Sequence, residues 1–93
     1  MLSSHKTTVS ADATAHVIVT YVNTQIVRVN KDDTITLNTG GYETVTTKRK
    51  MNQASAQFGL GYSVSQRDFQ WYVTKPNGDE VRLEGDSITF ETA

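Results

Sequence analysis

Most of the chain consists of short segments in which apolar and polar residues alternate. The alternation is clearest at 16–21, where Val19 points to one side of an extended strand and Ile18 to the other. Comparable segments at 26–29 and 35–37 follow after short polar turns. This spacing predicts a three-stranded antiparallel meander in the first half of the chain.

A second group of alternating segments lies in the last third of the chain, at 62–64, 69–73, 81–83 and 88–90. The strongest turn signal of the sequence, Pro-Asn-Gly-Asp at 76–79, separates two of these segments. Proline presets φ at the first turn position, and Asn-Gly accepts the positive φ of a hairpin turn. These segments predict a second antiparallel meander.

Between the two groups, one segment has the spacing of a helix. The positions that share one helical face are Thr47, Met51, Ala54 and Phe58. Gly59 can adopt the left-handed conformation that ends a helix, and Leu60 can make the accompanying apolar contact. The spacing predicts a helix over 46–58.

The entry to this helix is rich in glycine and threonine. Gly40 and Gly41 permit positive φ, and therefore a sharp change of direction after the preceding strand. Thr44, Thr46 or Thr47 can cap the helix by accepting a hydrogen bond from an unpaired backbone N–H group.

Together these elements predict an α+β fold, in which antiparallel β-meanders of about six strands carry one central α-helix packed on the sheet. Residues 1–93 are expected to form a single domain, with residues 1–13 as a loose N-terminal arm or an edge strand. The segments at 27–39 and 81–92 also align with each other. This alignment indicates either an internally duplicated β-meander or a chance similarity of two hairpins rich in Thr and Asp.

The alternation and the helical stripe also predict the core. Phe69 is expected inside, and so are the residues Val17, Val19, Val27, Val29, Ile35, Leu37, Met51, Ala54, Phe58, Val64, Trp71, Val73, Val81, Leu83, Ile88 and Phe90.

Composition restricts the classes of protein that fit. Apolar residues make up 37% of the chain and there is one Pro, so the chain does not resemble a disordered protein. The sequence has no Cys, which excludes disulfides and thiolate metal sites and suits a reducing cytoplasm. No apolar run approaches the ~20 residues of a membrane span, and residues 1–4 lack the apolar segment of a signal peptide.

Three consecutive basic residues, Lys48, Arg49 and Lys50, occupy the first turn of the predicted helix. That end of a helix is positive, so each cation there costs a few tenths of a kcal/mol, up to about 1 kcal/mol. Free N–H groups, threonine hydroxyls and three cations would converge there, which predicts an anion site. The alternative is a solvated face whose cations pair with Glu43 or with acidic residues elsewhere. The candidate ligand-binding residues are Lys48, Arg49, Lys50, Thr46, Thr47, Asn52, Gln53, Gly40, Gly41 and Tyr42.

Four stretches of the sequence resemble a known family. They are Asn-Thr-Gly-Gly at 38–41, Thr-Thr-Lys-Arg-Lys-Met-Asn-Gln-Ala-Ser at 46–55, Gln-Phe-Gly-Leu-Gly-Tyr at 57–62 and Phe-Gln-Trp-Tyr-Val at 69–73. This pattern resembles a family of small proteins encoded by tailed bacteriophages, including phages of marine bacteria. The resemblance covers 34–73 well and the N-terminal strands loosely. It implies a phage origin and a location in the host cytoplasm, and it implies nothing about chemistry.

Residues that could support catalysis are not grouped in the sequence. His5 and His16 are expected on the surface, and Asp12 is the nearby carboxylate, which is a weak signal for a metal site. There is no Ser-His-Asp set, no phosphate-binding Gly-rich loop with Lys-Ser/Thr and no close carboxylate pair. We therefore expect no enzyme, no cofactor and no metal. A nuclease that uses Lys, Arg and Tyr is the enzymatic alternative, and nothing in the sequence favours it.

Three functions fit these observations. The first is binding of nucleic acid, a nucleotide or another anion, in which the cations meet phosphates and Tyr42 or Tyr72 stacks on a base. The second is a protein-interaction module that acts on a host or phage protein through a sheet face or the basic helix. The third is a homo-oligomeric virion or accessory structural subunit. A solvent-facing aromatic residue such as Tyr72 would serve the second or the third.

Overall fold

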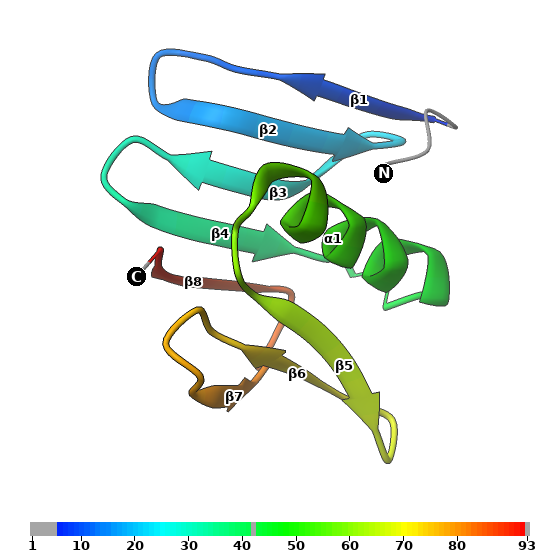
Figure 1. Cartoon of the computed structure of the whole chain (residues 1–93). Helices are drawn as coiled ribbons and strands as arrows, with labels where there is room; N and C mark the ends of the chain where they lie inside the picture. Colours follow the sequence, from blue (N-terminus) through cyan, green and yellow to red (C-terminus); the bar gives the residue numbers. More distant parts are fainter. Residues whose placement is uncertain (1–5, 42, 93) are drawn as a thin grey trace.

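The computed structural model describes residues 6–41 and 43–92, and these residues form eight strands and one helix (Figure 1). In chain order the elements are β1 (Thr7–Ser10), β2 (Ala15–Tyr21), β3 (Thr24–Asn30), β4 (Thr34–Asn38), α1 (Val45–Phe58), β5 (Ser63–Arg67), β6 (Gln70–Thr74), β7 (Glu80–Arg82) and β8 (Ser87–Glu91). The predicted α+β class is confirmed. The predicted number of about six strands is too low.

The strands form two antiparallel sheets. Five strands take the order β1-β2-β3-β4-β8, and three take the order β5-β6-β7. Because Thr7–Ser10 pairs with β2, this part of the N-terminal segment is an edge strand. Helix α1 lies over the five-stranded sheet near β3 and also contacts β5 of the other sheet (Figure 1).

Strand β8 contradicts the predicted second meander. It pairs with β4, with Phe90 opposite Ile35, and does not pair with β7. The segments that align in sequence therefore differ in structure, since β3 and β4 form a hairpin while β7 and β8 belong to different sheets. Burial of the Phe90 side chain explains the choice, because pairing with β4 places that ring in the core. The structure does not show an internal duplication.

Helix α1 begins and ends at the predicted capping residues. Thr44 is the N-cap, and its hydroxyl oxygen accepts a hydrogen bond from the Thr47 backbone N–H at 3.1 Å. Gly59 is left-handed, with φ 64°, and the Leu60 N–H donates to the Ser55 carbonyl in a Schellman motif. The helix starts one residue before the predicted range.

The described residues share one hydrophobic core between the two sheets and α1. Most of the predicted core residues are buried there, and those that are only partly buried are Val17, Val29, Phe58, Val81 and Ile88. Tyr62 joins the core, where its ring meets the Phe90 ring edge to face at 5.8 Å between centroids.

Two isoleucines that were not among the predicted core residues are buried. Ile26 is an extra residue in β3, because the register shifts between the pairs Val19↔Val27 and Thr20↔Gln25. This β-bulge turns the Ile26 side chain into the core. Ile18 points to the sheet face opposite α1, as its alternation predicts, and it is nevertheless buried.

The prediction for Phe69 is wrong. Strand β5 pairs with β6 up to Arg67↔Gln70, so Asp68 and Phe69 form a two-residue hairpin turn. The Phe69 side chain is 90% exposed. Trp71, which was predicted in the same strand, is buried as expected.

Candidate functional site

The candidate anion site contains a row of side chains along one side of α1 that borders β5. Lys48 and Arg49 lie there with Asn52 and Gln53, and together with Val45 and Ala56 they line a shallow open groove. A spacing of three and four residues places these side chains on one helical face. We call these six residues the outward stripe. Four of the predicted site residues are thus close neighbours.

Lys50 does not belong to the outward stripe. Successive helical residues point about 100° apart, so Lys50 faces the five-stranded sheet. Its side chain is only 3% exposed, and Nζ lies 5.1 Å from the centroid of the Tyr21 ring, a cation–π contact. The expectation that three cations converge at one point is therefore wrong.

The two glycines before the helix shape the chain and do not offer free N–H groups. Gly40 and Gly41 have φ of 62° and 86°, as predicted. Their N–H groups donate to Asn38 Oδ1 at 3.0 Å and Thr39 Oγ1 at 3.2 Å. A Cβ on Gly40 would lie 2.8 Å from Thr24 Oγ1, so glycine is needed for this close approach.

The two threonines of the candidate site have different environments. Thr46 is exposed at the second helical position. Thr47 is buried, and its hydroxyl lies 3.0 Å from the Thr44 hydroxyl. Thr46 is therefore the threonine that an external ligand can reach.

The two amide side chains of the outward stripe also differ. Asn52 Nδ2 donates to the Val64 carbonyl at 2.9 Å, and Asn52 Oδ1 accepts from the Val64 N–H at 2.7 Å. These two bonds connect α1 to β5. Gln53 is partly exposed, which makes it the better candidate of the two for a contact with a ligand.

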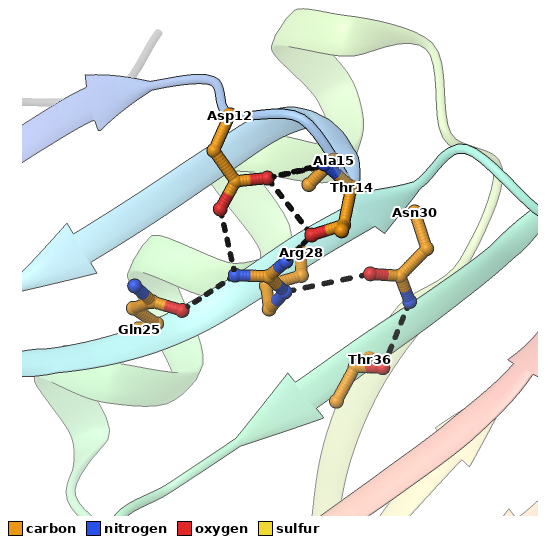
Figure 2. Close-up of polar contacts among 7 residues, drawn as sticks. All are labelled: Asp12, Thr14, Ala15, Gln25, Arg28, Asn30 and Thr36. Carbon is orange, nitrogen blue, oxygen red and sulfur yellow. Dashed lines mark hydrogen bonds and ion pairs between the residues drawn. The ribbon is translucent and has the colours of Figure 1, made fainter.

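Arg28 belongs to a separate polar network on the sheet face opposite α1 (Figure 2). Its guanidinium donates to Gln25 Oε1 at 2.8 Å and to Thr14 Oγ1 at 2.7 Å, and it lies 3.6 Å from the Asp12 carboxylate. Hydrogen bonds from the Thr14 backbone and hydroxyl hold the pKa of Asp12 below its ordinary value. Asn30 extends the network toward β4. The charge of Arg28 is therefore compensated within the molecule.

Arg67 is compensated as well. Its guanidinium forms an ion pair with Glu80 and lies 4.1 Å from the centroid of the Tyr72 ring. The hydrogen bonds from Arg67 lower the pKa of Glu80. One face of the Tyr72 ring is thus occupied, which leaves less of the ring for stacking on a base.

Lys48 and Arg49 differ from these three basic residues. Neither makes an ion pair with any residue at 6–41 or 43–92, and this includes Glu43, which was the expected alternative partner. Lys48 is partly exposed and Arg49 is exposed. Both charges are therefore accessible to an external anion.

A second concave feature was not predicted from the sequence. A pocket of about 370 Å³ opens beside the N-terminal end of α1. We call it the hairpin pocket, and its lining residues are Tyr21, Val22, Asn23, Thr24, Ile26, Thr39, Thr44 and Thr47. These side chains come from the end of β2, the β2–β3 turn, the start of β3, the residue after β4 and the start of α1, so the pocket has no contiguous sequence signal.

Other site classes find little support within the described part of the chain. It holds no group of three His, Cys, Asp or Glu residues that could bind a metal ion. None of its helices has the length and apolarity needed to cross a membrane. His16 is exposed in β2, as predicted. His5 and Tyr42 lie outside the described residues.

Comparison with protein families identified a family that this chain matches. The family model described as Kyanoviridae Gp96 protein matches residues 1–91. Comparison with curated proteins and with solved structures gave no match.

Proposed function

The chain belongs to the Kyanoviridae Gp96 protein family, a family of bacteriophage proteins, and we propose that it is a non-enzymatic protein that binds a polyanion. The polyanion that fits best is nucleic acid, bound through Lys48 and Arg49. One observation carries the proposal. Two cations lie near the N-terminal end of α1, as its fourth and fifth residues, on the outward stripe and without an ion pair to any described residue.

Stability does not account for these two residues. The positive end of the helix dipole disfavours Lys48 by a few tenths of a kcal/mol and Arg49 by less, because Lys48 closes the first turn and Arg49 begins the second. Lys50, by contrast, packs on Tyr21, while Arg28 and Arg67 pair with acidic residues. An anionic partner would offset the cost at Lys48 and Arg49, because it would pair with both charges and with the helix terminus.

The chemistry of the stripe fits phosphate groups. The Arg49 guanidinium can donate two parallel hydrogen bonds to one phosphate, and the Lys48 ammonium can act as a point charge on the next. Thr46 and Gln53 are the neighbouring accessible donors. Contacts of this kind carry no sequence information by themselves, so we propose binding with little sequence preference. We propose the cytoplasm of the infected host as the location.

The test is a binding titration with labelled single-stranded and double-stranded oligonucleotides, followed by fluorescence anisotropy across a salt series. The test variant is Lys48→Gln with Arg49→Gln. The matched control is Lys31→Gln with Arg82→Gln, which changes the net charge equally at two exposed positions away from α1. The affinity of the parent protein should fall steeply with salt, and the test variant should lower the salt slope by about 1 per residue removed.

Thermal unfolding of the same variants separates binding from folding. The test variant should be as stable as the parent, or more stable by a few tenths of a kcal/mol, since it removes unfavourable charges near the N-terminal end of α1. The proposal is rejected if the parent binds no oligonucleotide at low salt. It is also rejected if the test and control variants lose affinity equally.

One observation favours a second function, a protein-interaction module. Phe69 presents an exposed aromatic ring at the turn between β5 and β6. Exposed aromatic residues are enriched among the anchors of protein interfaces.

A further inference from the structure

We propose that the protein self-associates head to tail, with Phe69 of one copy inserted into the hairpin pocket of the next. This inference concerns a different surface from the outward stripe and does not depend on polyanion binding.

The projecting part of the contact is the turn between β5 and β6. Asp68 and Phe69 have φ of 51° and 66°. Aspartate adopts such values more readily than most residues, but a bulky residue such as Phe69 rarely does. Asn-Gly or Asp-Gly is the usual sequence for such a two-residue turn. Here the chain retains a strained backbone and a ring that is 90% exposed. Strain of this kind is concentrated at functional sites, because folding alone does not favour it.

The charge of this turn is that of a single carboxylate. Arg67 is already paired with Glu80 and covers a face of Tyr72. Asp68 makes no ion pair with any residue that the structure describes. The turn therefore presents one aromatic ring beside one uncompensated negative charge.

The hairpin pocket has the complementary character. Ile26 and Tyr21 supply apolar lining, and Val22 stands at its edge with a side chain that is 56% exposed. Val22 also has a positive φ of 58°, which a β-branched residue rarely adopts. The pocket adjoins the N-terminal end of α1, the positive end of the helix dipole, whose first turn contains no acidic residue.

The two surfaces fit each other in size and in charge. A pocket of about 370 Å³ is within the range that small organic groups occupy, so it can admit one phenyl ring. The Asp68 carboxylate would then lie near the positive end of α1. Within one molecule the two parts are separate, since the β5–β6 turn is at the bottom of Figure 1 and the β2–β3 turn is at the right, beyond β2. A contact between different surfaces of identical copies is heterologous, and it produces rings or open filaments.

Sedimentation velocity over a concentration series tests the proposal. The sedimentation coefficient of the parent should rise with protein concentration. The affinity of association should be weak, as expected of a contact with a single anchoring side chain. Phe69→Gly removes the ring and relieves the strained φ, so the fold is retained and association should be lost. Val22→Asp places a like charge opposite Asp68 and tolerates positive φ better than Val, so association should also be lost. Val9→Asp is the control, because Val9 is an exposed apolar residue on β1 that does not line the pocket, and it should leave association unchanged.

A mixing experiment gives the most specific readout. The Phe69→Gly variant keeps the pocket, and the Val22→Asp variant keeps the ring. A mixture of the two should therefore form a complex of one copy of each, held by one intact contact, because the ring of the Val22→Asp copy enters the unchanged pocket of the Phe69→Gly copy. The new carboxylate then lies in the other pocket, which stays empty. In a second mixture, of Phe69→Gly with the parent, the variant should limit assemblies to short ones, because it accepts a ring and offers none.

Two results would overturn the inference. The first is a parent that stays monomeric over the whole series, and the second is a Phe69→Gly variant that associates like the parent. If the parent is monomeric and its affinity for oligonucleotides also falls on Phe69→Gly, the ring is assigned to base stacking instead. A failure of the outward stripe to bind oligonucleotides leaves the assembly experiment unaffected, so the two proposals fail separately.

Discussion

Replacement of Phe69 by Gly should make the protein more stable, although it removes a large apolar side chain. The left-handed conformation costs an L-residue roughly 1–2 kcal/mol, and glycine does not pay this cost. The greater chain entropy of glycine in the unfolded state reduces the gain by about 0.5–1 kcal/mol. Little apolar burial is lost, because the ring is 90% exposed. The net expectation is a stabilisation of about 1 kcal/mol, which for a chain of this size raises Tm by roughly 4–8 °C.

The matched control is Phe69→Ala, which removes the ring and keeps the Cβ that causes the strain. It should leave Tm close to that of the parent. Thermal unfolding followed by circular dichroism, at a concentration where all three proteins are monomeric, measures both differences. If the Gly variant is no more stable than the Ala variant, the turn is not strained, and the argument that function maintains Phe69 loses its energetic basis.

Two further predictions concern the core. Trp71 is 2% exposed, so Trp71→Ala should lower the free energy of unfolding by roughly 3–5 kcal/mol, measured by chemical denaturation. Trp71→Phe should cost less, because it fills part of the space and removes a buried indole N–H that has no partner among the described residues. An unchanged midpoint for the Ala variant would mean that the indole is exposed. Burial raises the pKa of the Tyr62 phenol above its ordinary value of 10.0, so the unfolded state loses this proton first as the pH rises, and stability should fall above pH 10. Tyr62→Phe should be less stable at neutral pH by about 1 kcal/mol, because it loses the 2.6 Å hydrogen bond to the Met51 carbonyl. Its stability should also depend less on pH above 10. If the stability of both proteins falls equally with pH in that range, the Tyr62 phenol is not the group responsible.

The sequence indicates only some of the residues on which the two proposals depend. The outward stripe contains Lys48 and Arg49, which the basic run at the start of the helix indicates. The same run also indicated Lys50, whose packing on Tyr21 depends on a strand far away in the chain. No linear pattern indicates the hairpin pocket, because its lining residues come from separate segments of the chain, and the close approach of Gly40 to Thr24 is seen only in the folded structure.

The sequence by itself determined the local structure of this protein. The ends of α1 follow from Thr44 and Gly59, whose capping hydrogen bonds reach residues three or four positions away. The turn at 76–79 and the positions of most strands were also predictable, for the same reason. Side-chain alternation and backbone sterics act over a few neighbouring residues, so a short window contains the relevant information.

Tertiary structure decided which strands pair and which side chains remain accessible. Strand β8 joins β4 because that pairing buries Phe90, and Phe69 is exposed because the register of β5 against β6 leaves it in the turn. A shift of one residue in register exchanges the two faces of a strand, and the burial that fixes the register involves residues distant in sequence. Arg28 and Lys48 look alike as basic residues in the sequence, and only the fold surrounds one with Asp12 and Thr14 and leaves the other without an ion pair among the described residues. Strand pairs and ion pairs between residues distant in sequence depend on contacts that form only when the whole chain is folded.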